Sequence, residues 1–177
     1  MPGTIILSHG LDSSPAAIKV GALAACAEAR GWHCTRPDYR ADDALGLAAT
    51  VRPRLARLDA AIAACPAPPV LVGSSMGAFV SALASLARPV AGLFLLATPP
   101  LVPGSGLALD LRAGVPAFCI HGWRDAVCPA SAMQAFAAAR RLPLLLVDDE
   151  HRLADSLGVI VAEFESFLER HFRAPAD

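Results

Sequence analysis

Short apolar segments alternate with longer, alanine-rich amphipathic segments along nearly all of the 177 residues. The alternation is the pattern of repeated strand-helix units. Strands that are apolar throughout are expected where helices cover both faces of a parallel sheet. The sequence therefore predicts an α/β fold, a three-layer sandwich with a six-stranded parallel sheet, in a single domain over residues 1–177. The predicted strands are "TIILSHG", "HCTRPDY", "PVLVGS", "AGLFLLA", "PAFCIHG" and "LPLLLVDD".

The segments between the predicted strands carry helix signals. Ser14 can cap a first helix, with Pro15 in its first turn and Gly31 at its end. A second helix is expected over residues 43–64, with a break or kink at Pro53. The connection "TPPLVPGSGLALDLRAG" is expected to hold at most one helical turn. Because sites in open parallel sheets form beyond the carboxyl ends of the strands, candidate site residues are expected in the loops that follow strands.

Composition argues against several classes of protein. The 15 basic and 16 acidic residues give a net charge of −1, and no Lys/Arg block could follow a phosphate backbone, so nucleic-acid binding is not expected. Although 55% of the residues are hydrophobic, no apolar run has the length of a membrane span. The start "MPGTIILSHG" lacks the features of a secretory signal, and a cytoplasmic protein is expected. The five cysteines form no CxxC pair and no His/Asp cluster has ligand spacing, so neither a metal nor a cofactor is expected.

A Gly-x-Ser-x-Gly motif, formed by Gly73, Ser75 and Gly77, lies between an apolar strand and an apolar helix. This is the pattern of a nucleophile elbow, in which the serine occupies a sharp strand-to-helix turn. Glycine is expected at both flanking positions because the turn brings neighbouring backbone against the serine and leaves little room for a Cβ. Ser75 is therefore the predicted nucleophile, whereas Ser74 does not fit this register.

A serine hydroxyl is a weak nucleophile unless a base accepts its proton. Of the five histidines, we interpret His33 and His171 as surface residues. His9 and His121 are each followed by glycine and are interpreted as residues that shape loops. His151 follows the last predicted strand, on the side where the nucleophile is expected. It is the predicted general base.

The base in turn needs a carboxylate that orients it. Asp125 follows the strand between the nucleophile and the histidine, and it is the predicted orienting group. Asp148 and Asp149 compete for this role, but they are so close in sequence to the histidine that reaching its Nδ1 would be awkward. The order Ser75, Asp125, His151 is the order of the triad along the chain of α/β hydrolases.

Acyl transfer also requires two donors for the oxyanion of the tetrahedral intermediate. The Met76 N–H directly follows the nucleophile, at a helix N-terminus whose dipole favours negative charge. The second donor is expected in the loop "SHGLDSS", where Gly10 lets the chain turn so that the Leu11 N–H faces the site. An ordinary strand-to-helix loop is the alternative interpretation of this segment.

The segments "LSHGLDSSP", "GSSMG", "HGWRDAVCP" and "DDEHRL" resemble, in order and spacing, four marked segments of small α/β-hydrolase serine esterases. The match spans nearly the whole chain and is most similar to compact members that lack the first two strands. This resemblance implies a strand order of 2-1-3-4-5-6, the triad and oxyanion donors given above, and a fold without a cap domain. Relatives commonly have an aliphatic residue before the proline of the loop that carries the acid. This chain has Cys128 there, which could make the site sensitive to thiol reagents.

These features together predict a serine hydrolase that cleaves small or short-acyl carboxylic esters through an acyl-enzyme, with a small-molecule ester as its partner. A thioesterase or amidase with the same triad is an alternative, as is a non-catalytic binding protein on a hydrolase fold. The pocket is expected to be shallow and open. A homodimer through an edge strand or the "TPPLVP" connection is left open. Candidate substrate contacts are Asp12, Leu101, Trp123 and Arg124.

Overall fold

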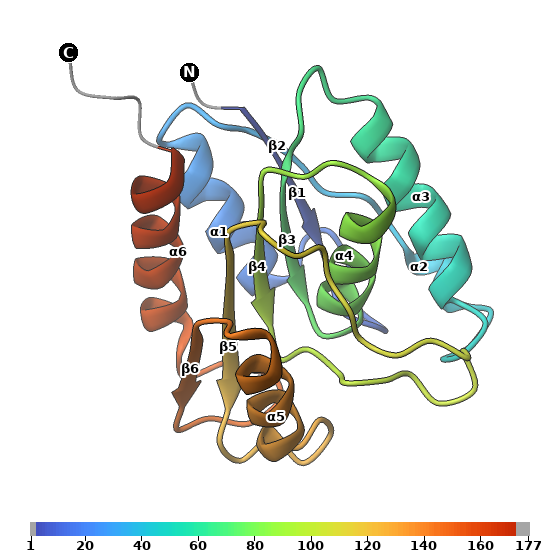
Figure 1. Ribbon diagram of the computed structural model, residues 1–177. Helices are drawn as coiled ribbons and strands as arrows, with labels where there is room; N and C mark the ends of the chain where they lie inside the picture. Colours follow the sequence, from blue (N-terminus) through green and yellow to red (C-terminus); the bar gives the residue numbers. More distant parts are fainter. Residues whose placement is uncertain (1–2, 173–177) are drawn as a thin grey trace.

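A six-stranded, all-parallel sheet forms the centre of the protein in the computed structural model, which describes residues 3–172 (Figure 1). The strand order is β2-β1-β3-β4-β5-β6, and each neighbouring pair is parallel. Both the order and the parallel arrangement confirm the predictions. The strands are β1 (Thr4–Ser8), β2 (His33–Thr35), β3 (Val70–Ser74), β4 (Gly92–Leu96), β5 (Ala117–Gly122) and β6 (Leu144–Val147).

Helices cover both faces of the sheet, as the apolar strands predicted (Figure 1). Helices α1 and α6 pack together on one face, and α3, α4 and α5 cover the other. This is the three-layer arrangement expected from the alternating pattern. The helices are α1 (Ile18–Glu28), α2 (Arg40–Asp43), α3 (Val51–Ala63), α4 (Met76–Ala87), α5 (Ala130–Arg140) and α6 (Leu157–Phe172).

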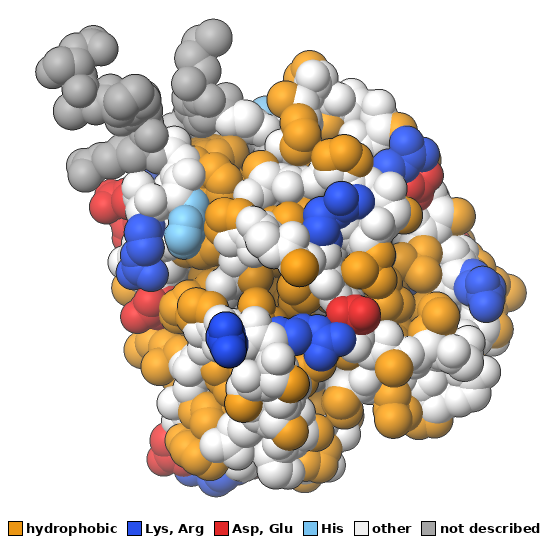
Figure 2. Space-filling model, in the orientation of Figure 1, with side chains coloured by type: hydrophobic (Ala, Val, Ile, Leu, Met, Phe, Trp, Pro, Cys, Tyr) orange, Lys and Arg blue, Asp and Glu red, His pale blue; other side chains and the backbone are white. Residues whose placement is uncertain are grey.

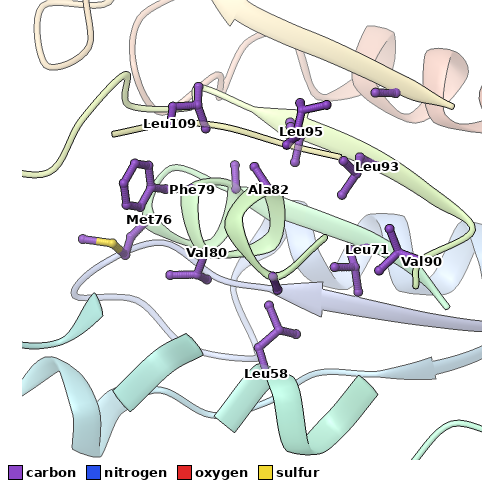
Figure 3. Close-up of a cluster of buried hydrophobic side chains, with 14 of the residues drawn as sticks. Leu58, Leu71, Met76, Phe79, Val80, Ala82, Val90, Leu93, Leu95 and Leu109 are labelled. Carbon is purple, nitrogen blue, oxygen red and sulfur yellow. The ribbon is translucent and has the colours of Figure 1, made fainter. Parts of the chain in front are cut away.

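Each central strand contributes side chains alternately to two separate hydrophobic cores. In β4, Leu93 and Leu95 join the core beneath α3 and α4, whereas Phe94 and Leu96 join the core beneath α1 and α6. Figure 3 shows the first of these cores, with Phe79 and Val80 of α4 among its members. Because full burial of a large aliphatic or aromatic side chain contributes about 1.5–3 kcal/mol, these two cores fix the strand register. The carboxyl ends of the strands are thereby held at one edge of the sheet.

The first helix begins later than the sequence predicted. It starts at Ile18 with Ala17 as its N-cap residue, and no side chain caps it. The Ser14 hydroxyl instead accepts a hydrogen bond from the Ala16 N–H at 3.2 Å, in a turn that precedes the helix. A serine side chain that bonds its own local backbone competes with helix formation, which explains the difference. Gly31 lies just beyond the helix with a φ of 81°, as expected for a residue that ends it.

The expected helix over residues 43–64 is wrong in its first part. The chain forms the short α2, which ends at Asp43, and then a separate α3 that begins at Val51. Gly46, with a φ of 89°, interrupts the helical path between them. Pro53 is the third residue of α3, so it lies in the first turn, where its missing N–H leaves no hydrogen bond unmade. Proline therefore helps to start this helix instead of kinking it.

The connection between β4 and β5 contains no helix, and its one regular feature is an antiparallel bridge between Leu101 and Ala108. The carboxyl edge of the sheet therefore carries no cap domain within residues 3–172. Over the same residues, no helix combines the length and the apolar character that crossing a membrane requires. On the face shown in Figure 2, basic and acidic side chains are interspersed among hydrophobic and neutral groups.

Candidate active site

Ser75 occupies the sharp turn between β3 and α4. Its backbone has a φ of 55° and a ψ of −119°, a strained conformation for a residue with a side chain. The turn is held by a hydrogen bond of 2.8 Å from the Ser75 N–H to the carbonyl oxygen of Leu96 in β4. Strain of this kind at the head of a helix is what a nucleophile elbow requires, because it lifts the serine hydroxyl above the edge of the sheet.

The two motif glycines are required by backbone contacts. A Cβ at Gly73 would lie 2.5 Å from the backbone of Gly77 and Ala78. A Cβ at Gly77 would overlap the backbone of Ser8 and His9 in the neighbouring loop. Because real Cβ atoms do not approach backbone atoms this closely, neither position can accept alanine without a shift of the turn. The crowding that the motif predicted is present at both positions.

Three side chains from three different loops form one chain of hydrogen bonds. The Ser75 Oγ lies 2.9 Å from the Nε2 of His151, and the Nδ1 of His151 lies 2.8 Å from the Oδ2 of Asp125. His151 follows β6 and Asp125 follows β5. The Asp125 side chain is fully buried, whereas that of His151 is 20% exposed. The histidine can therefore meet a ligand while its orienting carboxylate is shielded from water.

The Asp125 carboxylate is fixed by three hydrogen bonds. Its Oδ1 accepts the backbone N–H groups of Val127 at 2.9 Å and Cys128 at 2.7 Å. Its Oδ2 faces His151 on one side and the Nε2 of His121, at 3.2 Å, on the other. The same His121 Nε2 lies 2.6 Å from the Cys128 carbonyl oxygen, so it carries the proton and donates it to that carbonyl group.

The competing carboxylates have other partners. Asp149 accepts the backbone N–H groups of Glu150 at 2.7 Å and Ser156 at 2.9 Å, and so stabilises the loop after β6. Asp148 forms an exposed ion pair of 2.7 Å with Arg124. Asp149 thus stabilises the loop that carries His151. Asp125, from the loop after β5, contacts the imidazole itself.

His9 shapes the loop that follows β1. Its Nδ1 lies 2.8 Å from the Gly10 carbonyl oxygen, and its Nε2 accepts the Tyr39 N–H at 3.0 Å. The proton must therefore be on Nδ1, which donates it to Gly10. Burial lowers the pKa of His9, so the ring is neutral at physiological pH. These contacts agree with the interpretation of His9 as a loop-shaping residue.

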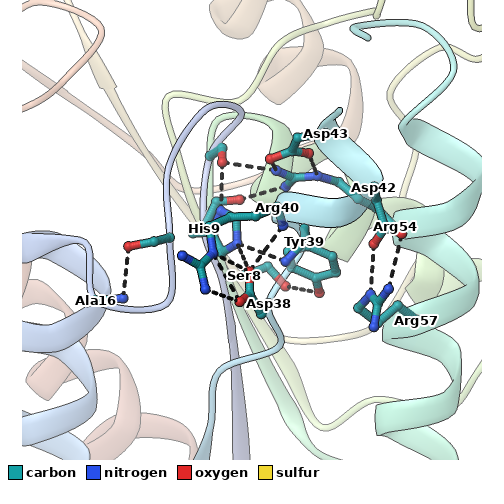
Figure 4. Close-up of polar contacts among 12 residues, drawn as sticks. Ser8, His9, Ala16, Asp38, Tyr39, Arg40, Asp42, Asp43, Arg54 and Arg57 are labelled. Carbon is teal, nitrogen blue, oxygen red and sulfur yellow. Dashed lines mark hydrogen bonds and ion pairs between the residues drawn. The ribbon is translucent and has the colours of Figure 1, made fainter. Parts of the chain in front are cut away.

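A buried arginine clamps the same loop from the other side (Figure 4). Arg54 of α3 is fully buried and donates to the carbonyl oxygens of His9, at 2.8 Å, and Gly10, at 3.0 Å. It also forms two hydrogen bonds of 2.6 Å with the Asp43 carboxylate. Its guanidinium lies 4.6 Å from the centre of the Tyr39 ring. Arg54 thus links the backbone of the loop after β1 to the buried Asp43 carboxylate.

The backbone at Leu11 and Met76 flanks Ser75 on two sides. Met76 directly follows the serine, and a Cβ built at Gly10 would lie 3.5 Å from the Ser75 Cβ. Within residues 3–172, neither the Leu11 N–H nor the Met76 N–H has a hydrogen-bond acceptor. Two amides that remain free beside a nucleophile are available to a bound substrate.

A cavity of about 660 Å³ opens beside Ser75 and His151, between the β1–α1 loop and the start of α6. This volume is typical of small-molecule sites. Its walls are mostly aliphatic, with charged groups from Asp12, Lys19 and Arg152. The aliphatic lining includes Leu11, Ile18, Val20, Val127, Leu153 and Leu157.

The structure brings one of the four predicted substrate contacts to this cavity. Asp12 lines it, whereas Leu101, Trp123 and Arg124 are not part of its lining. Leu101 and Trp123 are exposed, and Arg124 is engaged by Asp148. These three positions stay predictions as substrate contacts.

Cys128 is buried beside Asp125 and His151. Its Sγ lies within 4.8 Å of a carboxylate oxygen of Asp125 and a ring nitrogen of His151. The residue is only 5% exposed, and burial raises the pKa of its thiol to about 12. Since the thiolate is the reactive form, we expect Cys128 to be alkylated by iodoacetamide far more slowly than a free cysteine, with little loss of activity. Alkylation rates measured by mass spectrometry check this. If activity is instead lost rapidly and in parallel with Cys128 labelling, this expectation is wrong. The site is then sensitive to thiol reagents, as the sequence suggested.

The sequence did not predict that Arg54 and Asp43 would support the loop after β1, or that Lys19 would line the cavity. One signal was available for Arg54: it occupies a position in the buried stripe of α3, where Val51, Leu58 and Ile62 are its neighbours and an apolar residue is expected. A charged residue in such a stripe is almost never buried unless it is paired.

Comparison with known proteins agrees with this fold. Residues 5–175 match the model of the alpha/beta hydrolase family. A Xanthomonas campestris pv. campestris protein of the alpha/beta hydrolase superfamily is 42% identical, with a TM-score of 0.91 over 95% of this chain and 99% of that one. No curated protein matches the sequence.

Two further structures share the fold at low identity. The ydeN gene product of B. subtilis is 15% identical, with a TM-score of 0.76 over 94% of this chain and 99% of that one. Est1E of Butyrivibrio proteoclasticus is 18% identical, with a TM-score of 0.73 over 96% of this chain and 88% of that one. The family match over nearly the whole chain and the 42% identity lead to the same conclusion. This chain belongs to the alpha/beta hydrolase family.

Proposed function

We propose that the protein is a serine hydrolase that cleaves small or short-acyl carboxylic esters through an acyl-enzyme. The observation that carries the proposal is the continuous hydrogen-bonded chain from the Ser75 Oγ through the His151 imidazole to the buried Asp125. A nucleophile, a base within hydrogen-bond distance and a third group that orients the base are the requirements for covalent acyl transfer.

The first half of the reaction forms the acyl-enzyme. The Ser75 Oγ attacks the ester carbonyl carbon while its proton passes to the His151 Nε2, and Asp125 stabilises the resulting imidazolium. The tetrahedral intermediate then collapses, the bond to the alcohol oxygen breaks, and that oxygen leaves with the proton from Nε2. In the second half, water attacks the acyl carbon and gives one proton to the His151 Nε2. His151 passes this proton to the Ser75 Oγ as the bond between the serine and the acyl group breaks and the carboxylic acid leaves.

The oxyanion of the intermediate would be bound by the N–H groups of Leu11 and Met76. In a trans peptide the carbonyl oxygen and the following N–H point in opposite directions. His9 and Arg54 both hold the Gly10 carbonyl oxygen, so they also fix the direction of the Leu11 N–H in the same peptide unit. Donors that are oriented before the reaction stabilise developing charge without reorganisation.

The substrate class rests on the shape of the site and on one neighbour. No cap covers the carboxyl edge of the sheet within residues 3–172, so the alcohol side of the site stays open and suits small esters. Est1E, which shares the fold, has been solved with ferulic acid bound. A carboxylic acid is the product that ester hydrolysis leaves in the site, so this bound ligand supports the proposed chemistry.

The test is labelling by a fluorophosphonate together with initial rates on p-nitrophenyl acetate, butyrate and octanoate. We expect stoichiometric labelling of the wild type, no labelling of Ser75→Ala, and rates that fall as the acyl chain lengthens. Ser81→Ala is the matched control, because this serine is buried in the same helix and its hydroxyl has no partner among the described residues.

Each alternative function has a distinct outcome. If a folded wild type is not labelled, the elbow is not activated and the protein acts by binding. If labelling occurs but thioesters or amides are turned over faster than matched oxygen esters, the leaving group has been assigned wrongly. A clear preference for octanoate would contradict the short-acyl pocket.

A further inference from the structure

The cavity beside Ser75 carries a positive charge that the proposed reaction does not use. Lys19, the only lysine in the chain, lines this cavity from the first turn of α1. Its ammonium donates to the carbonyl oxygen of Arg152 and forms no ion pair with a carboxylate of residues 3–172. Because an ammonium has three N–H donors, two are left for a ligand.

The charges around Lys19 leave the cavity positive overall. Arg152 also lines it and has no ion-pair partner among the described residues, and the one carboxylate in the lining is the exposed Asp12. Two further carboxylates, Asp149 and Asp125, act on Lys19 from a distance, but both are already bound by several donors. No carboxylate among residues 3–172 forms an ion pair with the ammonium.

The position of the ammonium has a solvation cost that a ligand would relieve. Burial is the main effect on Lys19 and lowers its pKa to about 8, so the group is still mostly charged at neutral pH. A charged group that has lost water and gained no counter-charge binds an anion more strongly than an exposed lysine does. Ser75 and Lys19 line the same cavity, and its mostly aliphatic walls suit a short methylene chain.

We propose that Lys19 makes this cavity selective for acyl groups that carry a carboxylate, so that the preferred substrates are monoesters of short dicarboxylic acids. The proposal rests on the esterase function given above. The ester carbonyl lies at Ser75, the methylene groups lie along the aliphatic wall, and the distal carboxylate accepts hydrogen bonds from Lys19. Arg152 adds to the attraction at the rim of the cavity.

The experiment compares pairs of substrates that differ at the end of the acyl chain. Monoethyl succinate, glutarate and adipate are compared with ethyl butyrate, pentanoate and hexanoate, with ethanol release measured by gas chromatography. We expect kcat/KM to favour the charged member of at least one pair by about tenfold, the usual size of one charge-assisted contact. In Lys19→Met the ratio of kcat/KM for the charged and the neutral ester should fall to about one. Lys19→Arg should retain much of the preference.

A matched control separates a local contact from a general effect of charge. Arg88→Met also removes one positive charge, but Arg88 is exposed, pairs with Asp59 and does not line the cavity. It should leave the preference unchanged. If Lys19→Met lowers the rates on both members of every pair equally, Lys19 only holds the Arg152 loop and the proposal is overturned. Equal rates on both members in the wild type would overturn it as well.

The pH dependence gives a second measurement. Above about pH 8 Lys19 loses its proton, so the preference for the charged ester should fall between about pH 7 and about pH 9 in the wild type. The substrate carboxylate stays ionised over this range, and any effect of pH that is common to both esters cancels in the ratio. A preference that does not change with pH would contradict the role of Lys19.

Failure of this proposal can be told apart from failure of the esterase function. Binding of monoethyl glutarate and ethyl pentanoate to Ser75→Ala, measured by calorimetry, needs no turnover. Tighter binding of the charged ester that is lost in Ser75→Ala/Lys19→Met supports the anion site even if the natural reaction is not ester hydrolysis. Ester turnover that depends on Ser75 but shows no charge preference retains the esterase and removes the anion site.

Discussion

Ser75→Ala and His151→Ala are each expected to lower kcat on an ester by about a millionfold, and the double variant is expected to be no slower than either single variant. The two side chains act as one unit in the proposed mechanism, because the serine attacks only when the imidazole 2.9 Å away accepts its proton. Removing either partner therefore removes the whole nucleophilic route. The residual rate in all three variants should come from substrate binding and the oxyanion donors.

The measurement is kcat on p-nitrophenyl acetate for the wild type, both single variants and the double variant, with folding checked by circular dichroism. Asp125→Asn is a useful companion, since it keeps the shape but reverses the preferred tautomer of the imidazole, and a loss of about 10⁴ is expected. Losses that multiply in the double variant would mean that Ser75 and His151 act independently. A Ser75→Ala protein that retains most of its rate would exclude the proposed mechanism.

Arg54→Met is expected to lower the free energy of unfolding by about 3–5 kcal/mol. The variant leaves the Asp43 carboxylate buried without its arginine, and the carbonyl oxygens of His9 and Gly10 each lose the hydrogen bond from Arg54. An uncompensated buried charge is among the most destabilising changes in a protein. Urea unfolding at neutral pH, followed by fluorescence, measures the loss.

The double variant Arg54→Met/Asp43→Leu tests the physical reason. When both charges are removed, no unpaired charge remains, so the double variant should be more stable than Arg54→Met alone. If instead the two losses add, the arginine stabilises the fold through its carbonyl contacts and not through the ion pair.

The effect of Arg54 on catalysis needs a variant that still folds. Arg54→Lys keeps a positive charge near Asp43 but lacks the planar fork that reaches two carbonyl groups at once. With the direction of the Leu11 N–H less well fixed, kcat should fall by about tenfold to a hundredfold while KM changes little. A matched fall in the rate of fluorophosphonate labelling is expected, because that reaction uses the same oxyanion donors. An unchanged kcat in a destabilised variant would limit Arg54 to a structural role.

The local patterns of the sequence determined the fold class and the three side chains of the proposed triad. Apolar segments with helices between them predicted the parallel sheet, and a parallel sheet places the ends of all its strands at one edge. For this reason Ser75, Asp125 and His151, each directly after a strand, could be expected to meet although they are far apart in the chain. The motif glycines predicted the crowded turn in the same way.

Helix boundaries were predicted less well. Ser14 looked like a cap, but its hydroxyl bonds the adjacent backbone and the helix begins at Ile18. The segment before Val51 looked helical, but Gly46 turns the chain there. At such points the local signals nearly balance, and packing against the sheet decides where a helix starts.

Only the tertiary structure decided which side chains support and surround the triad. Arg54 reaches a carbonyl group 45 residues away, and Lys19 reaches one 133 residues away, across the cavity wall. Neither contact follows from periodicity, turn chemistry or a motif, because each depends on how two loops approach once the sheet has formed. Backbone carbonyl groups occur at every residue, so the sequence does not mark the one that a buried charge will bind. The groups proposed to react were therefore determined by the sequence. The contacts of His9 and Arg54 with the Gly10 peptide and the position of Lys19 in the cavity were determined by the packing of loops at the carboxyl edge of the sheet.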